Sequence, residues 1–211
     1  MLILIPEWFF EIQPFIYLFV SMIGFLVSFY FYRSFSLSKQ KNHYYMYLSF
    51  AILSMGFLVF GITELYTYLS ITKGTMAMFE EFSSFRDFGI WIYYACSLIS
   101  YGLLCYIYLP KDWKAALFLP YWYKGFPYFH VLSLFLISYV IFRSTGNWFV
   151  TRTRNSMLVM LAFLGLGGYH LFMFFTSFSE WAIVLAHLSL MAGFMCMFYM
   201  IFRVSRKKGR F

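Results

Sequence analysis

The chain contains six long apolar stretches, each of a length that can cross a lipid bilayer as a helix. They cover residues 14–32, 44–71, 88–109, 126–142, 156–177 and 181–202, and charged or turn residues bound each one. A membrane-spanning helix needs about 20 mostly apolar residues, and none of the six shows the alternation of a membrane β-strand. The sequence therefore predicts an all-α, polytopic transmembrane helix bundle.

The composition agrees with a membrane protein. Hydrophobic residues make up 63% of the chain and charged residues 11%, with a mean hydropathy of +0.73, whereas soluble domains are about 25% charged. The net charge of +8 comes from basic residues at the ends of the spans, so we expect the partner to be the lipid bilayer and not nucleic acid. The segment MLILIPEWFFEIQ lacks a basic signal-peptide region, and we expect an interfacial lead-in broken by Pro6 and Pro14.

The segment 110–125, PKDWKAALFLPYWYKG, decides the number of crossings. Its apolar core of nine residues is about 13 Å long as a helix, shorter than the hydrocarbon layer of about 30 Å. With the N-terminus outside and a crossing at 110–125, 13 of the 16 basic residues lie inside, and only Lys73, Arg86 and Lys124 lie outside. The positive-inside rule therefore favours seven spans with a cytoplasmic C-terminus in the cell membrane. Six spans are the alternative.

Self-comparison suggests an internal repeat within a single transmembrane domain, 1–211. GFLVFGITELY (56–66) aligns with AFLGLGGYHLF (162–172), which pairs Gly61 with Gly167 and Glu64 with His170. The third span aligns with the last through Gly102 and Gly193 and through the cysteines Cys105 and Cys196. We expect a first three-helix repeat at 1–109, a short linking span at 110–125, and a second three-helix repeat with a basic tail at 126–211.

This 3+1+3 arrangement resembles, in topology only, that of the sugar-transporting SWEET and PQ-loop proteins, which also use parallel repeats. Gln13-Pro14 has the reverse order of a PQ motif. In addition, AFLGLGGYHLF and AHLSLMAGFMCMFYMIFRVSR, in the second half of the chain, resemble segments of uncharacterised archaeal seven-helix membrane proteins. That resemblance implies the seven-helix fold and carries no activity.

Five polar residues within the spans are candidates for ligand binding, because such residues are costly in a membrane. We expect all of them about 6–12 Å below the outer boundary, at 1.5 Å per residue: Glu64, Cys96, His130, His170 and His187. Imidazole with carboxylate or thiolate suits a transition metal. Two facing histidines suit haem b, and titrating groups suit a proton or substrate pathway. The alternative is that a histidine within a span has only a packing role and hydrogen-bonds to a neighbouring helix.

No hydrolase, ATPase or zinc-protease motif occurs in the sequence, so no catalytic residue is expected. We expect the basic tail to contact lipid headgroups through Arg203, Arg206, Lys207, Lys208 and Arg210. The leading hypothesis is a sensor, or a subunit of a larger membrane complex or homo-oligomer, which binds a metal, haem or small ligand in the outer half. The alternatives are a small-molecule, ion or proton transporter or channel, and a b-type cytochrome-like electron-transfer subunit.

Overall fold

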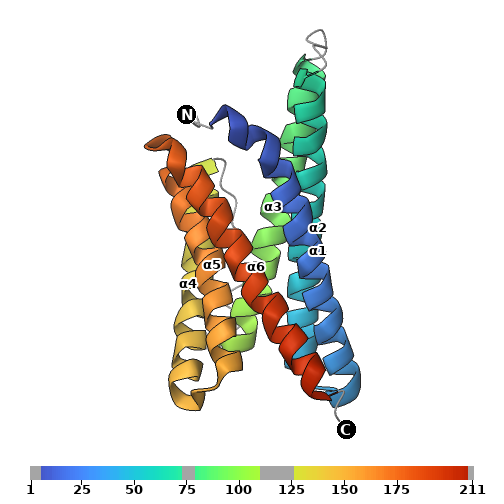
Figure 1. The fold of residues 1–211 in the computed structure, drawn as a ribbon, viewed down its shortest axis with the longest axis vertical. Coiled ribbons are helices and arrows are strands. Elements are labelled where there is room, and N and C mark those ends of the chain that lie inside the picture. Colours follow the sequence, from blue (N-terminus) through green and yellow to red (C-terminus); the bar gives the residue numbers. More distant parts are fainter. Residues whose placement is uncertain (1–5, 73–78, 110–125, 209–211) are drawn as a thin grey trace.

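The chain forms a bundle of long helices (Figure 1). The computed structural model describes residues 6–72, 79–109 and 126–208. These residues form α1 (Glu7–Ser38), α2 (Lys41–Thr72), α3 (Phe79–Tyr108), α4 (Phe126–Thr151), α5 (Arg154–Phe174), the 3-10 helix η3 (Phe175–Ser177) and α6 (Glu180–Lys208), and they contain no strand. Six helices are long and apolar enough to cross a membrane, which confirms the predicted helix bundle. The expected additional crossing, 110–125, lies outside the described residues.

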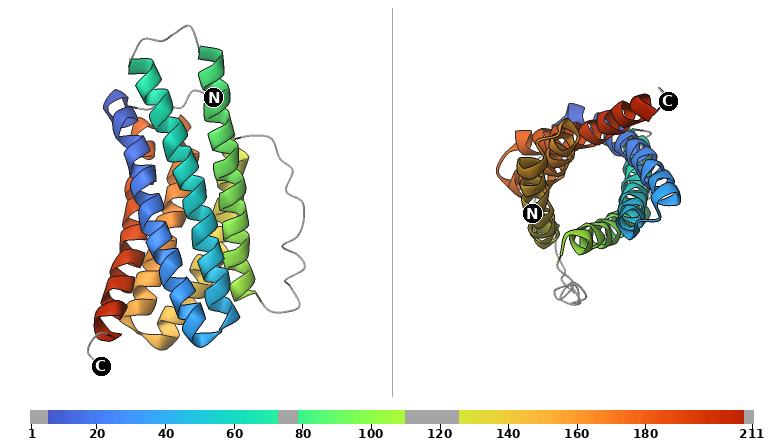
Figure 2. Two further views of the ribbon diagram at one scale, coloured as in Figure 1. Left: turned by 90° about the vertical axis from the view of Figure 1, so that its right-hand side faces the viewer. Right: turned by 90° about the horizontal axis from the view of Figure 1, so that it is seen from below.

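Tight turns join the helices at one end of the bundle. Lys39 adopts a left-handed backbone with φ 55° and donates its N–H to the Phe35 carbonyl, which ends α1. Thr153 precedes α5, and its side chain accepts a hydrogen bond from the Ser156 N–H. We call this end of the bundle the C-terminal end, and the opposite end, where α1 begins, the N-terminal end (Figures 1 and 2).

Residues 7–13 of the N-terminal lead-in are helical and continue into the rest of α1, so the expectation of a break at Pro14 was wrong. Pro6 precedes the first residue of α1, and Pro14 lies inside the helix. Proline at the start of a helix costs no backbone hydrogen bond, whereas an internal proline removes one and bends the helix. Figure 1 shows the first turns of α1 tilted against the rest of the helix.

The two helices on either side of residues 110–125 run parallel to each other. Contacts between α3 and α4 join residues at increasing positions in both helices: Tyr94 with Phe129, Cys105 with Leu136, and Tyr108 with Tyr139. Antiparallel neighbours would show the opposite order. Tyr108 and Phe126 therefore lie at opposite ends of the bundle (Figure 2).

The helices form two halves, α1–α3 and α4–α6, in which neighbouring helices are antiparallel. The halves meet where α1 packs against α6 and where α3 packs against α4, and the view along the bundle shows the helices arranged in a ring (Figure 2). The α1–α6 pair is also parallel, because the contacts advance together along both helices. Tyr17 contacts His187, and Gly24, further along α1, lies against Phe194, further along α6. At both junctions between the halves, the two helices that meet therefore run parallel to each other.

Burial follows the predicted pairing of α2 with α5 but not that of α3 with α6. Phe57, Gly61 and Glu64 are buried, as are their predicted partners Phe163, Gly167 and His170. By contrast, Gly102 faces open space, whereas Gly193 packs against Gly165. The buried α3 residues Tyr93, Ser97 and Tyr101 match the buried Ala186, Leu190 and Phe194, which is a register two residues away from the predicted one.

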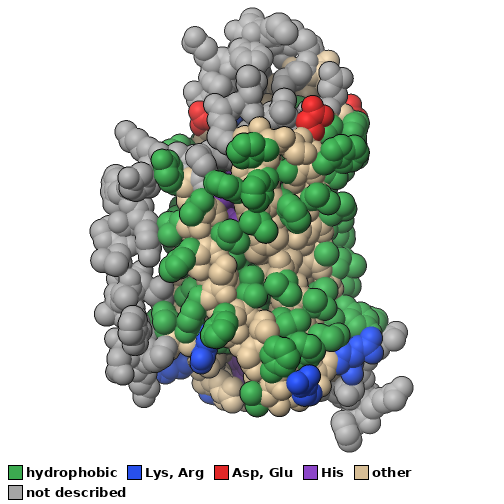
Figure 3. Space-filling view, turned by 90° about the vertical axis from the view of Figure 1, so that its left-hand side faces the viewer, with side chains coloured by type: hydrophobic (Ala, Val, Ile, Leu, Met, Phe, Trp, Pro, Cys, Tyr) green, Lys and Arg blue, Asp and Glu red, His purple; other side chains and the backbone are tan. Residues whose placement is uncertain are grey.

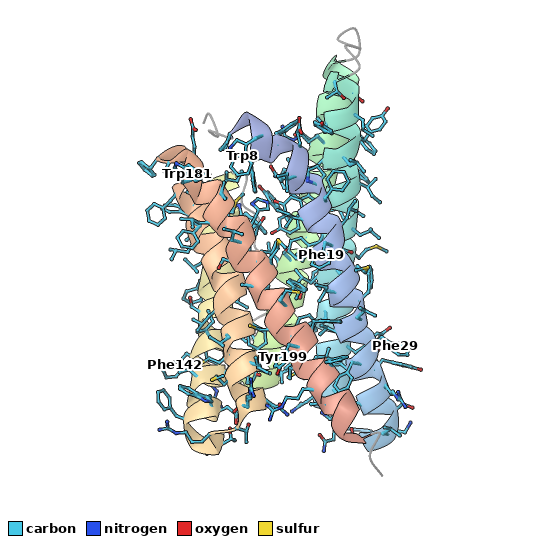
Figure 4. The ribbon with its side chains drawn as sticks, in the orientation of Figure 1. Trp8, Phe19, Phe29, Phe142, Trp181 and Tyr199 are labelled. Atoms are coloured by element: carbon cyan, nitrogen blue, oxygen red, sulfur yellow. The ribbon has the colours of Figure 1, made fainter. Side chains whose placement is uncertain are left out.

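The outer surface of the bundle is apolar along its length and charged at its ends. Phe135 and Phe142 are each 73% exposed, as expected for side chains in contact with lipid. On the face in Figure 3, Lys and Arg lie at the C-terminal end, and Asp and Glu lie at the N-terminal end. Trp8 and Trp181 project at the N-terminal end (Figure 4). This chain is an integral membrane protein in contact with the bilayer.

Candidate functional site: a buried cluster of histidines and tyrosines

Nine buried Gln, Glu, Tyr and His side chains lie inside the described part of the bundle, nearer the N-terminal end. All six helices contribute to this group, which we call the polar cluster: Gln13, Tyr17, Glu64, Tyr93, Tyr101, His130, Tyr169, His170 and His187. None of them is more than 4% exposed. Polar groups removed from water are costly unless they find hydrogen-bond partners, so the contacts within the cluster define its chemistry.

Three of these side chains form a hydrogen-bonded chain. The Tyr101 hydroxyl lies 2.8 Å from Nε2 of His170, and Nδ1 of His170 lies 3.0 Å from Nδ1 of His130. A neutral imidazole donates through one nitrogen and accepts through the other. When the Tyr101 hydroxyl donates to Nε2 of His170, Nδ1 of His170 must therefore donate to His130. In the opposite direction, His130 donates to His170 and His170 donates to Tyr101, which requires the ring proton of each histidine to lie on its other nitrogen. The chain joins α3 of the first half to α4 and α5 of the second.

A second contact between the halves joins Tyr17 on α1 to Tyr169 on α5. Their hydroxyl oxygens are 3.3 Å apart. The Tyr17 ring also contacts Phe60, with 4.7 Å between the ring centroids, and His187, with 5.0 Å. Tyr17 therefore lies at the centre of the cluster, where α1, α2, α5 and α6 converge.

His187 exposes a lone pair inside the protein. Its Nδ1 is 2.7 Å from the carbonyl oxygen of Ile183, which can only accept, so Nδ1 carries the proton and Nε2 is an acceptor. Among the described residues, Nε2 has no hydrogen-bond partner. The oxygen of the Gln13 side chain, Oε1, also lacks one in this described part of the chain.

The two residues that carry these acceptors lie on the facing sides of α1 and α6. The rings of Phe9 and Tyr17 both contact His187, each with 5.0 Å between centroids. Gln13 lies between them on the same face of α1, because residues four apart are neighbours on a helix. Gln13 Oε1 and His187 Nε2 are thus two buried acceptors on facing helices, and each of them calls for a hydrogen-bond donor.

Glu64 forms a partly buried ion pair. Nε of Arg86, on the third turn of α3, lies 2.9 Å from Oε1 of Glu64, and the two side chains are 36% and 2% exposed. The pair stands at the edge of the cluster toward the N-terminal end, and Arg86 reaches into it from outside. A buried carboxylate needs such a partner, since an isolated charge is strongly disfavoured there.

The structure unites four of the five predicted site residues and leaves one apart. His130 and His170 are in direct contact; His187 joins them through the Tyr169 ring, and Glu64 lies at the edge. Cys96 is half-buried and faces Gly56 on α2. The described residues contain no group of three or more His, Cys, Asp or Glu side chains that could hold a metal ion.

A haem between His130 and His170 does not fit this geometry. Their Nδ1 atoms hydrogen-bond directly, and no porphyrin plane could lie between two nitrogens in that contact.

Sequence reasoning also missed the buried tyrosines and Gln13. A chain with 19 tyrosines does not reveal which of them face inward. The signals available were the Tyr169-His170 pair and the spacing of Gln13 and Tyr17 within one turn.

Of the predicted headgroup contacts, the structure describes the side chain of Arg203, which donates to Asn155 Oδ1 at 3.4 Å. The other four, Arg206, Lys207, Lys208 and Arg210, lie outside the described side chains.

Comparisons of the chain with models of known protein families, with curated proteins and with solved structures found no match.

Proposed function

We propose that this protein is a small proton-coupled membrane transporter whose substrate and proton site is the polar cluster between its two halves. The observation that carries the proposal is the Tyr101–His170–His130 chain, because it joins titrating side chains across the boundary between the halves. In transporters built from repeats, binding sites lie at the repeat interface, and the halves move against each other around the site. Histidine is suited to proton transfer near neutral pH.

The proposed architecture is a pair of parallel three-helix repeats joined by a crossing within residues 110–125. The parallel course of α3 and α4 supports it, because the connection must return from one end of the bundle to the other. The similar burial of α2 and α5 and the two parallel junctions between the halves support it too. Such a chain crosses the membrane seven times, so its termini lie on opposite sides.

The proposed orientation has the N-terminus outside and the C-terminus in the cytoplasm of the cell. Lys and Arg side chains lie at the C-terminal end on the face shown in Figure 3, and basic residues favour the cytoplasmic side. The polar cluster then lies in the outer half of the membrane, with the Glu64–Arg86 pair toward the outside.

Currents from proteoliposomes on a solid-supported membrane test the transport function. Jumps in the concentration of guanidinium, acetate, glycine or protons should give a current with the wild-type protein for at least one of them. Protein-free vesicles should give none, and His170→Ala should lose the current. The matched control is His43→Ala, because His43 lies near the turn between α1 and α2, bonded to Ser38. Silence of the wild type for every solute would reject electrogenic transport.

A second candidate is a ligand-binding sensor or a subunit of a membrane complex. Two acceptors that have no partner among the described residues, Gln13 Oε1 and His187 Nε2, favour it, because two such atoms can hold a small molecule without transport. Native mass spectrometry of the purified protein would detect a retained molecule. Retention that is lost in a Gln13→Leu variant, together with silent proteoliposomes, would favour this candidate over transport.

A further inference from the structure

The Glu64–Arg86 pair places a guanidinium group on the buried carboxylate of the polar cluster. The carboxylate of Glu64 is buried, and the group bound to it is a guanidinium that enters from the edge of the cluster. Arg86 is about one-third exposed, so part of its side chain already lies outside the buried interior. A buried acid with a displaceable cation is a site at which another cation can compete.

Two acceptors of the cluster have the same preference. Gln13 Oε1 and His187 Nε2 are acceptors without donors among the described residues, and their side chains are at most 4% exposed. Both would be satisfied by N–H groups of a ligand, whereas an anion would bring further acceptors. The tautomer of His187 is fixed by the Ile183 carbonyl, so Nε2 stays an acceptor as long as the ring is neutral.

Aromatic rings surround this region. Tyr17 contacts Phe60 at 4.7 Å between centroids, and Phe60 stacks on Tyr93 at 5.2 Å. Phe60 precedes Glu64 by one helical turn on the buried side of α2. The faces of aromatic rings carry negative potential and attract cations. The carboxylate, the two acceptors and the rings thus favour the same class of ligand.

We infer that the polar cluster binds a small organic cation that bears N–H donors, of the guanidinium or primary ammonium class, and that this cation displaces Arg86 from Glu64. The inference builds on the proposed transporter and specifies its substrate class. In the transport cycle, Arg86 occupies the Glu64 carboxylate while the site is empty and moves outward when the substrate binds. The substrate and Arg86 therefore alternate on one carboxylate, and Glu64 is not left buried without a partner.

Isothermal titration calorimetry on the purified full-length protein in detergent tests the binding. Guanidinium at millimolar concentrations, well below denaturing levels, should bind, and tetramethylammonium should not, because it has the charge without N–H donors. Glu64→Gln should abolish guanidinium binding. The matched control is Glu180→Gln, since Glu180 is exposed in the first turn of α6, and it should bind like the wild type.

Arg86→Ala gives a second, independent result. Without its competitor, guanidinium should bind at least ten times more tightly than to the wild type. Guanidinium should also raise the unfolding temperature of this variant more than that of the wild type, which gives a readout even for a destabilised protein. Unchanged affinity in Arg86→Ala would show that Arg86 does not occupy the site.

Separate outcomes distinguish the inference from the transport proposal. Guanidinium binding and guanidinium currents in proteoliposomes, both lost in Glu64→Gln, support the two together. Currents with acetate, without guanidinium binding, would overturn the inference and leave transport standing. Guanidinium binding in silent proteoliposomes would support the site and reject transport. Equal binding of guanidinium and tetramethylammonium would overturn the requirement for N–H donors.

Discussion

The Nδ1 atoms of His130 and His170 lie 3.0 Å apart, so one imidazole must donate to the other. Because His170 also hydrogen-bonds to Tyr101 through Nε2, the tautomers of the two histidines and the direction of the tyrosine hydroxyl are linked. A proton that enters at one end of this chain changes the hydrogen bonds at the other. The linkage extends from α4 through α5 to α3, and thus from one half of the bundle to the other.

Replacing Tyr101 with Phe should destabilise the protein by about 1–3 kcal/mol, because Nε2 of the buried His170 would lose its partner. Tyr101 and His170 are fully buried, so water does not replace the hydroxyl. Unfolding of the purified protein in detergent measures the change. Tyr199→Phe is the control, since Tyr199 is 43% exposed, and it should change the stability by less than about 0.5 kcal/mol. Equal effects of the two variants would contradict the hydrogen bond.

Arg86→Ala should cost about 3 kcal/mol, near the lower end for a broken buried ion pair, because Arg86 is partly exposed. Glu64→Gln should cost less, since it leaves no buried charge. The double variant Glu64→Gln/Arg86→Ala should therefore be more stable than Arg86→Ala alone. Unfolding of the four proteins forms a double-mutant cycle. Additive effects would show that the two side chains do not interact.

Gly165→Ala should separate α5 from α6. A Cβ atom at Gly165 would lie 2.6 Å from the Cα of Gly193 and from the Ser189 carbonyl oxygen, and backbone atoms cannot yield by rotating. We expect a loss of about 1–3 kcal/mol or more. Gly146→Ala is the control, because Gly146 is also helical but has no atom near its Cβ position. That change should be neutral or stabilise by up to about 1 kcal/mol.

Cysteine labelling tests the number and direction of the crossings. In a variant without native cysteines, Gln40→Cys and Val150→Cys mark the turns α1–α2 and α4–α5, and Ser179→Cys marks the approach to α6. Seven crossings require the first two on one side and Ser179→Cys on the other, and an impermeant thiol reagent added to intact cells should label only Ser179→Cys. Labels on residues 40 and 150 from opposite sides would support six crossings with an antiparallel α4.

Hydropathy predicted the six described helices well, because a membrane requires long apolar segments with internal backbone hydrogen bonds. The depth argument brought Glu64, His130, His170 and His187 into one layer, since depth depends only on position along a helix. It could not say which way a side chain faces, and Cys96 therefore turned out to lie against Gly56. The sequence placed Arg86 outside the membrane, before the third span. However, α3 begins at Phe79, so Arg86 lies within this helix and forms an ion pair with Glu64.

The most direct test of the central claim measures proton movement in proteoliposomes that contain a trapped pH-sensitive dye. An outward or inward gradient of guanidinium, acetate or glycine should move protons in wild-type vesicles for at least one solute, at a rate well above that of protein-free vesicles. His170→Ala, which breaks the chain between Tyr101 and His130, should reduce that rate at least tenfold, while His43→Ala should leave it unchanged. Wild-type vesicles indistinguishable from protein-free ones for every solute, or a His170→Ala variant as fast as the wild type, would contradict a transport role for the polar cluster.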